Sequence, residues 1–296
     1  MRRPLLAGDW GSTNLRLFKM DADGAVLAVR QAPRGVKTLT PEGFRSAFEA
    51  LAAELLEGEA PNGILLCGMV GARQGWLEAP YAEAPAGAAQ IAAAFIQVET
   101  RFRPAFIVPG LIAHREDGRA DVMRGEETQI LGAGAEGLVI TPGTHSKWAR
   151  VEAGRITGFT TYMTGELFEV LCRHSMLGAL IKQGPHDEAA FALGLARARA
   201  EPLASLLFSV RSEGLTGALP GRALASYLSG LLIGAEITAG LKGRPRADVT
   251  LIGEPALTAL YAAALGVFDL KPAQVIDGGA AVAAGLWRLW RERSRP

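Results

Sequence analysis

The feature that most restricts the fold of this chain is an order of strands and turns that occurs twice. Near the N-terminus an apolar strand is followed by a glycine turn (Gly11-Ser12-Thr13), a second strand, a glycine-containing hairpin and a third strand. The same order returns at residues 138–161, where the turn begins at Gly143, 132 residues beyond Gly11. Self-similarity at the spacing of one domain indicates an internal duplication.

Beyond these units, strands alternate with helices, which predicts an α/β fold. Apolar periodicity and turn signals predict a helix at 41–58 capped by Thr40, strands at 64–67 and 105–108, a helix at 126–131, mainly helical structure at 165–243, a strand at 249–252, a helix at 255–265, a strand at 274–276 and a helix at 279–290. We expect one domain at 1–134 and a second at 135–296, the latter with a helical insertion at 165–243.

Composition narrows the classes of function. With 31 Lys+Arg against 30 Asp+Glu, the chain lacks the basic surplus of a general nucleic-acid binder. Its two cysteines cannot form a disulfide framework, and Asp9 interrupts any signal-peptide run, so we expect a cytoplasmic protein. The longest apolar stretch, 224–241, contains Glu236 and two serines, which argues against a membrane span. Its glycines Gly230 and Gly234 suit either a core helix or the face of a homodimer.

Two familiar ligand sites are not indicated. Residues 132–137 match the GxGxxG pattern of dinucleotide-binding domains, but they follow a helix and precede a strand, which is the reverse of the required order. The chain has no Walker A sequence, and its four histidines lack zinc-site spacing.

The turn after the first strand is a candidate phosphate site. Its glycines allow close approach of an anion, and its N–H and hydroxyl groups are donors. Asp9, at the end of a buried strand, is costly as a lone carboxylate, and a hydrated Mg²⁺ carrying ATP phosphates is a suitable partner. The alternative is an ordinary hairpin with a capping Asp.

The matching turn of the second unit, Gly143-Thr144-His145, is followed by Ser146 and Lys147. Two such loops facing one another across a cleft would hold a polyphosphate from both sides, as phosphoryl transfer requires. Lys147 neutralises phosphate charge in this interpretation, and the alternative is a solvated strand lysine.

Two further segments carry reactive side chains. The glycine-rich loop at 66–76 holds Arg73, suited to a carboxylate, and Trp76, suited to packing on a sugar face; the alternative is a structural loop. Glu126 and Glu127 begin a helix, where acids either complement the helix dipole or supply the base that takes a hydroxyl proton.

Taken in order, six runs of the chain are similar to signature runs of the 2-dehydro-3-deoxygalactonokinase family. The runs are GDWGSTNLR, GMVGARQGW, MRGEETQ, PGTHSKW, MTGELFEVL and LIGEPALTALYAAAL. The paired glycine turns resemble those of the actin, sugar-kinase and Hsp70 superfamily. This resemblance implies two duplicated ribonuclease H-like (actin-like ATPase) domains around a central cleft.

The resemblance also implies roles for individual residues. Asp9 corresponds to the acid that positions Mg²⁺, and the resemblance favours Glu127 as base, with Glu126 and Asp121 as alternatives. The phosphate- and nucleotide-binding residues are then Gly11, Ser12, Thr13, Gly143, Thr144, His145, Lys147 and Gly253. The substrate-binding residues are Asn14, Arg16, Met69, Arg73 and Trp76. Glu254-Pro255 replaces the second glycine of the adenosine motif, and Thr141-Pro142 replaces an acid common in the superfamily.

The implied activity is that of a bacterial kinase of galactonate catabolism, which uses ATP and Mg²⁺ to phosphorylate the C6 hydroxyl of 2-dehydro-3-deoxy-D-galactonate. The alternatives are an exopolyphosphatase-like phosphohydrolase of the same fold, which Glu126-Glu127 motivates, and a non-catalytic sugar sensor. Partners are expected to be the sugar acid and ATP, with neither nucleic acid nor membrane.

Overall fold

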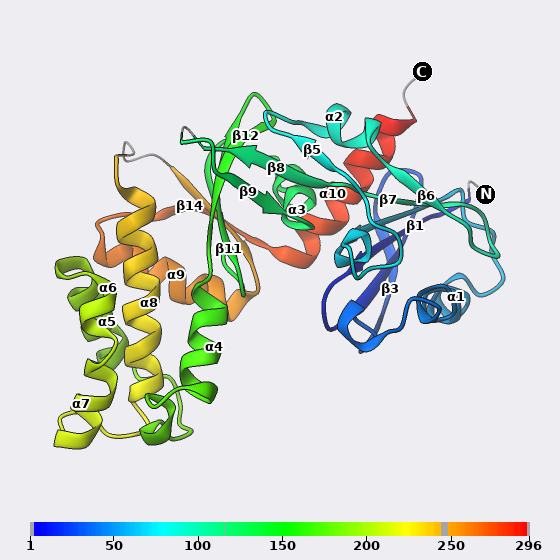
Figure 1. Ribbon diagram of the computed structural model, residues 1–296. Coiled ribbons are helices and arrows are strands. Elements are labelled where there is room, and N and C mark those ends of the chain that lie inside the picture. Colours follow the sequence, from blue (N-terminus) through cyan, green and yellow to red (C-terminus); the bar gives the residue numbers. More distant parts are fainter. Residues whose placement is uncertain (1–2, 116, 244–247, 295–296) are drawn as a thin grey trace. The chain divides into compact units, whose positions relative to one another are not determined.

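A computed structural model describes residues 3–115, 117–243 and 248–294, and it has a mixed α/β fold (Figure 1). The chain forms two compact units that are not continuous in sequence. Unit 1 comprises Met1–Glu136, Ala149–Phe159 and Ile276–Pro296, and unit 2 comprises Gly137–Trp148 and Thr160–Val275. The first break lies close to the boundary expected at 134/135. The C-terminal helix belongs to unit 1 because it packs there on another helix, a contact that sequence periodicity does not reveal.

Unit 1 is built on a six-stranded sheet of order β3-β2-β1-β4-β7-β6. Its strands are β1 (Leu5–Trp10), β2 (Leu15–Met20), β3 (Val26–Ala32), β4 (Gly63–Gly68), β6 (Ile96–Val98) and β7 (Ala105–Ile107). A smaller sheet holds β5 (Tyr81–Glu83), β8 (Gly110–His114) and β9 (Ala120–Met123). β1 runs antiparallel to β2 and parallel to β4, so that Asp9 pairs with Arg16 on one side and with Cys67 on the other.

Four α-helices accompany these sheets among the described residues of unit 1: α1 (Gly43–Leu56), α2 (Ala88–Ala93), α3 (Glu126–Ala133) and α10 (Gly278–Arg293). The predicted cap of α1 is wrong. The helix begins at Gly43 with Glu42 as its N-cap, because Thr40 instead forms a turn in which its carbonyl accepts from the N–H of Gly43.

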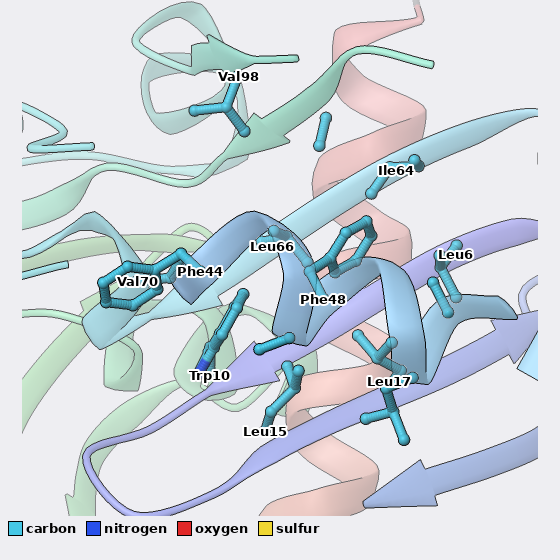
Figure 2. Packing of buried hydrophobic residues seen from close by; sticks show 14 of the residues in the cluster. Leu6, Trp10, Leu15, Leu17, Phe44, Phe48, Ile64, Leu66, Val70 and Val98 are labelled. Atoms are coloured by element: carbon cyan, nitrogen blue, oxygen red, sulfur yellow. The ribbon is translucent and has the colours of Figure 1, made fainter. Parts of the chain in front are cut away.

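The core of unit 1 lies between α1 and the sheet (Figure 2). Trp10 at the end of β1 is fully buried, and its ring centroid lies 5.4 Å from that of Phe44. The indole N–H of Trp10 donates to the carbonyl of Arg34 at 2.7 Å. Burial of such large rings contributes on the order of 2–3 kcal/mol each. The end of β1, which carries Asp9, is therefore held firmly in place.

Helices α3 and α10 cross at glycines. A Cβ added at Gly285 would lie 1.9 Å from the carbonyl oxygen of Thr128, and one added at Gly132 would lie 1.9 Å from that of Ala281. The first glycine of the 132–137 segment is thus part of a helix crossing. This close approach sets the position of α3, whose first turn carries Glu126 and Glu127.

We expect Gly285→Ala to lower the free energy of unfolding by at least about 2 kcal/mol, because the new methyl group must displace the backbone of α3. Denaturant unfolding measures this change. Gly266→Ala is the matched control: Gly266 lies in α9 (Pro255–Val267), and an added Cβ meets no atom within 4 Å. Alanine there is expected to raise stability by about 0.5–1 kcal/mol. Equal stability of the Gly285→Ala variant and the unaltered protein would contradict the argument.

Unit 2 contains most of a five-stranded sheet of order β12-β11-β10-β13-β14. The strands are β10 (Gly137–Thr141), β11 (Ser146–Glu152), β12 (Arg155–Tyr162), β13 (Val249–Gly253) and β14 (Pro272–Asp277). β10 pairs in parallel with β13. In both sheets, three strands that are consecutive in the chain lie side by side, and the first of them then pairs in parallel with a later strand.

Helices occupy the middle of unit 2. They are α4 (Thr164–His174), α5 (Glu188–Ala200), α6 (Leu203–Leu206), α7 (Ser209–Thr216), α8 (Leu224–Leu241) and α9. α8 is long and apolar enough to span a membrane, but 67% of it is buried inside the protein. A Cβ added at Gly230 would lie 2.2 Å from the carbonyl oxygen of Phe191 in α5, which lies beside α8 in Figure 1. Of the two alternatives for this glycine face, the core position is the one observed.

Candidate active site

A partly exposed carboxylate marks the end of β1 in unit 1. The side chain of Asp9 is 22% exposed, and its Oδ2 lies 3.3 Å from Nη2 of Arg16 on β2. Burial raises the pKa of Asp9, the nearby Arg16 lowers it, and the negative charge of Glu126 raises it. A further cation beside Asp9 would therefore stabilise the ionised form of its carboxylate.

The first glycine loop follows Asp9, and the backbone of residues 35–37 is hydrogen-bonded to it. The N–H groups of Gly35, Val36 and Lys37 donate to the carbonyls of Thr13, Gly11 and Ser12 at 2.9, 3.0 and 3.1 Å. A Cβ added at Gly35 would lie 2.2 Å from the backbone nitrogen of Thr13, so only glycine allows this approach. The carbonyl groups of the loop are therefore held by this support, while Ser12 is half-buried and Thr13 exposed.

Glu127 lies at the start of α3 and is fully buried. Its Oε2 accepts from the N–H of Gly125 at 2.6 Å, and its Oε1 accepts from the hydroxyl of Thr128 at 2.9 Å. Burial, followed by the negative charge of Glu126, raises the pKa of Glu127 to about 7, although these hydrogen bonds oppose the shift. Glu126 is half-buried and accepts from the N–H of Arg124 at 3.1 Å.

A raised carboxyl pKa links protonation to stability. Between pH of about 4.5 and about 7, Glu127 keeps its proton in the folded protein and loses it in the unfolded chain. The protonated Glu127 therefore stabilises the folded protein fully below about pH 4.5. This stabilisation decreases as the pH rises and is lost by about pH 7, a change of about 3 kcal/mol in the free energy of unfolding.

We accordingly expect the stability difference between the unaltered protein and Glu127→Gln to shift by about 3 kcal/mol over this pH interval, because the amide does not titrate. Guanidinium unfolding of both proteins at several pH values measures it. Parallel stability curves would show that Glu127 does not titrate in this range.

Asp9 and Glu127 lie in one neighbourhood of unit 1. The buried thiol of Cys67 has a pKa raised by burial and then by the negative charges of both carboxylates. A Cβ added at Gly68 would lie 3.4 Å from Oδ1 of Asp9, and one added at Gly125 would lie 3.3 Å from Cα of Gly68. The ends of β1 and β4 and the start of α3 therefore converge, and they bring together one partly exposed and one buried carboxylate.

Of the predicted substrate-binding residues in the loop after β4, one is exposed and two pack against the core. The Arg73 side chain is 88% exposed and faces Glu78 at 3.8 Å. Trp76 is half-buried and lies edge-on to Trp10, with a centroid distance of 6.2 Å. Met69 also packs against the core. Trp76 and Met69 therefore contribute to the packing beneath the end of β1.

Two other candidates have partners of their own in unit 1. Asn14 is exposed, and its amide donates to the hydroxyl of Thr13 at 3.0 Å. Asp121, an alternative base on β9, pairs at 2.9 Å with Arg115, the residue that follows β8.

The second glycine loop joins β10 to β11 in unit 2 and rests on the start of α4. The N–H of Glu166 donates to the carbonyl of Thr144 at 3.0 Å, and the Glu166 carboxylate pairs with Nε2 of His145. A Cβ added at Gly165 would lie 2.5 Å from the carbonyl oxygen of Gly143. Lys147 is buried, with its Nζ donating to the carbonyl of His145 at 3.2 Å, so it is not a solvated strand lysine.

A cavity of about 660 Å³ opens beside this loop within unit 2. Its polar lining includes Thr144, Thr164, His186, Ser229 and Glu254, and apolar side chains of α8 and α9 form much of the rest. Glu254 caps α9 by accepting from the N–H of Leu257 at 3.0 Å, and Pro255 is the first residue of that helix. Gly253 ends β13, where an added Cβ would lie 3.5 Å from the carbonyl oxygen of Pro142.

The model of the 2-keto-3-deoxy-galactonokinase family matches residues 9–289. The chain belongs to this family. Its relatives include a Rhizobium meliloti (strain 1021) protein assigned as 2-dehydro-3-deoxygalactonokinase DgoK1, 42% identical over 292 residues that cover 95% of this chain and 94% of the relative. The 2-dehydro-3-deoxygalactonokinase of Escherichia coli (strain K12) is 36% identical over 287 residues, or 95% of each chain.

Solved structures agree with this assignment to the galactonokinase family. A crystal structure from Sinorhizobium meliloti that carries the same family assignment superposes with a TM-score of 0.90 at 39% identity, covering 97% of this chain and 98% of the other. Component A of the (R)-2-hydroxyglutaryl-CoA dehydratase of Acidaminococcus fermentans has a TM-score of 0.52 at 14% identity, covering 98% and 99%. The latter likeness extends to the fold alone.

For this galactonokinase-family chain, sequence reasoning missed some residues beside the predicted ones. Gly35 lies far from any recognised motif, and no local signal indicates its role as a support. Thr164 and Gly165 lie in the run MTGELFEVL, where a Thr-Gly pair between a strand and a helix is a usable signal for a site. His186 faces the cavity from the irregular segment before α5, and Ser229 faces it from α8; neither segment has a sequence signal for ligand binding.

Proposed function

We propose that the protein is an ATP-dependent kinase that phosphorylates the C6 hydroxyl of 2-dehydro-3-deoxy-D-galactonate and yields 2-dehydro-3-deoxy-6-phosphogalactonate in galactonate catabolism. The observation that carries this proposal is membership of the galactonokinase family over residues 9–289. The curated relatives named as this kinase support the same activity. The reaction forms a bond between the C6 oxygen and the γ-phosphorus, breaks the bond from that phosphorus to ADP, and releases the C6 hydroxyl proton.

The first loop and Asp9 serve the phosphates in this proposal. Gly11, Ser12 and Thr13 donate to phosphate oxygens, and Arg16 offsets their charge. Among the described residues, no group of three or more His, Cys, Asp or Glu side chains is placed to enclose a metal ion. Mg²⁺ in kinases keeps several waters and takes one or two carboxylates plus substrate phosphates, so the single carboxylate of Asp9 fits this ion. When bound, Mg²⁺ neutralises phosphate charge.

Glu127 accepts the C6 hydroxyl proton in our proposal. A pKa of about 7 suits a base at neutral pH. Because Glu127 is fully buried, this role requires substrate to displace the groups that cover it, and the half-buried Glu126 is its competitor. Asp121 is a weaker candidate because Arg115 already holds its carboxylate.

Arg73 is proposed to bind the carboxylate of the sugar acid, since its guanidinium is exposed and its ion pair with Glu78 is long, at 3.8 Å. Asn14 would add a polar contact at the first loop. Met69 and Trp76 would shape the substrate site from the packed side of the loop after β4.

Unit 2 binds the rest of ATP in this proposal. Gly143, Thr144 and His145 donate to phosphates, and Lys147 adds a positive charge near that loop. The adjoining cavity of about 660 Å³ is large enough for the adenosine group, and Gly253 directly precedes Glu254, which lines it.

We further propose that the two units are duplicated ribonuclease H-like domains of the actin-like ATPase type, and that residues 165–243 are a helical insertion in the second. The strand order shared by the two sheets supports this duplication. A cytoplasmic location and a homodimer are retained as proposals, and light scattering tests the latter.

A coupled assay of ADP release from MgATP tests the function. We expect turnover with 2-dehydro-3-deoxy-D-galactonate and weaker turnover with its C4 epimer. Release of phosphate from polyphosphate without any sugar acid would favour a hydrolase. Tight binding of the sugar acid with no ADP formed would favour a sensor.

A further inference from the structure

A buried carboxylate lies on α8 beneath the second glycine loop of unit 2. Glu236 is 3% exposed. Its Oε1 accepts from the indole N–H of Trp148 at 2.7 Å, and its Oε2 accepts from the hydroxyl of Tyr261 at 2.6 Å and from the hydroxyl of Thr164. The hydroxyls of Ser146 and Tyr261 are 3.0 Å apart, which joins Ser146 to the same network.

The donors come from three elements around the second loop: β11, α4 and α9. Ser146 and Trp148 lie on β11, immediately after His145. Thr164 is the first residue of α4, whose next two residues contact the loop backbone at Gly143 and Thr144. Tyr261 lies on α9, and it lines the cavity together with Thr164. One carboxylate therefore joins the loop's outgoing strand, its supporting helix and two walls of the cavity.

Stability alone gives little reason for this arrangement. A carboxylate is costly to bury, and burial raises the pKa of Glu236 despite its hydrogen bonds. Replacing buried ionic groups with well-packed apolar residues is often neutral or stabilising. Apart from Ser226 and the hydroxyl of Tyr227, the other buried residues of α8 are apolar. A polar group that orients several binding elements at once gives those elements a defined geometry before ligand arrives.

We propose that Glu236 is a positioning residue for the nucleotide, which holds the second glycine loop and the Thr164 and Tyr261 walls of the cavity in the arrangement that receives ATP. This inference rests on the proposed function. Glu236 itself does not touch the phosphates; it acts through Ser146, Trp148, Thr164 and Tyr261.

Two substitutions separate this role from a general loss of stability. Glu236→Leu removes every acceptor, and Glu236→Gln keeps one oxygen for Trp148 while its amide donates to a hydroxyl. We expect Glu236→Leu to weaken ADP binding, measured by titration calorimetry, by about 10- to 100-fold, by analogy with the range for the outer hydrogen-bonding partners of metal ligands. KM for ATP should rise similarly, KM for the sugar acid should change less than about twofold, and Glu236→Gln should restore most of the affinity.

Glu213→Gln is the matched control. Glu213 is a half-buried acid on α7 in the same unit, and its Oε1 accepts from Nη1 of Arg197 at 2.7 Å. Neither residue lines the cavity. The Glu213→Gln substitution should lower the thermal midpoint of unfolding and leave the affinity for ADP unchanged. Trp148→Phe and Tyr261→Phe, which each remove one donor, replace Glu236→Leu if that variant does not fold.

The outcomes are distinct. Unchanged ADP affinity in folded Glu236→Leu, or in both single-donor variants, overturns the positioning role while leaving the proposed function intact. Equal loss of ADP affinity in Glu236→Leu and Glu213→Gln also overturns it, because stability alone would then explain both. If the unaltered protein binds no ADP, the proposed function fails and this inference fails with it.

Discussion

Glu127→Gln is expected to lower kcat by about 10²- to 10⁴-fold, the usual contribution of a positioned proton acceptor. The amide can keep both observed hydrogen bonds, with its oxygen facing the N–H of Gly125 and its nitrogen facing the Thr128 hydroxyl. The fold of the α3 start should therefore survive, and the loss should reflect proton transfer. In the unaltered enzyme, kcat/KM should rise with pH up to about 7, because the acceptor must be ionised.

Glu126→Gln is the natural comparison, since it removes the neighbouring charge from the same helical turn. We expect less than about a tenfold loss, together with a lower pKa for Glu127, because Glu126 is one cause of its raised value. The kcat/KM profile should accordingly move to lower pH. A larger loss in Glu126→Gln than in Glu127→Gln would assign the base to Glu126. Asp121→Asn tests the third candidate by the same assay, and we expect a loss of less than about tenfold.

Asp9→Asn is expected to lower kcat by about 10³-fold, which corresponds to about 4 kcal/mol of transition-state stabilisation. Asparagine preserves the shape of Asp9 and an oxygen for Nη2 of Arg16, but it carries no charge to attract Mg²⁺. The half-saturating Mg²⁺ concentration should therefore rise in steady-state titrations at fixed ATP.

Asp9 lies at the end of β1 and pairs with Arg16, so the stability of the Asp9→Asn variant must be measured alongside its turnover. Burial raises the pKa of Asp9, and an amide at this position avoids that cost, so the stability of Asp9→Asn should equal or exceed that of the unaltered protein at pH 7. Near-normal turnover and unchanged Mg²⁺ dependence in a folded variant would remove Asp9 from the phosphoryl-transfer site.

Much of the local structure was accessible from the sequence. The two strand–turn–strand units, the helical periodicity of α1 and the apolar runs of β4, β10 and β13 all depend on residues close together in the chain. The six family-like runs predicted the family, which the match over residues 9–289 confirms. The short strands β5, β6, β8 and β9 escaped prediction because three to five residues carry too little periodicity to be distinguished from loops.

The sequence alone determined the α/β class, the two glycine turns and the family, because these follow from local periodicity and from runs of adjacent residues. Tertiary structure alone decided that Gly35 supports the first loop, that Glu127 is fully buried, and that the half-buried Trp76 packs against the core. It also decided that Glu236 accepts from Trp148, 88 residues away in the chain. The burial and the pKa of a side chain depend on which distant segments of the chain pack around it. A pattern of neighbouring residues does not predict those contacts.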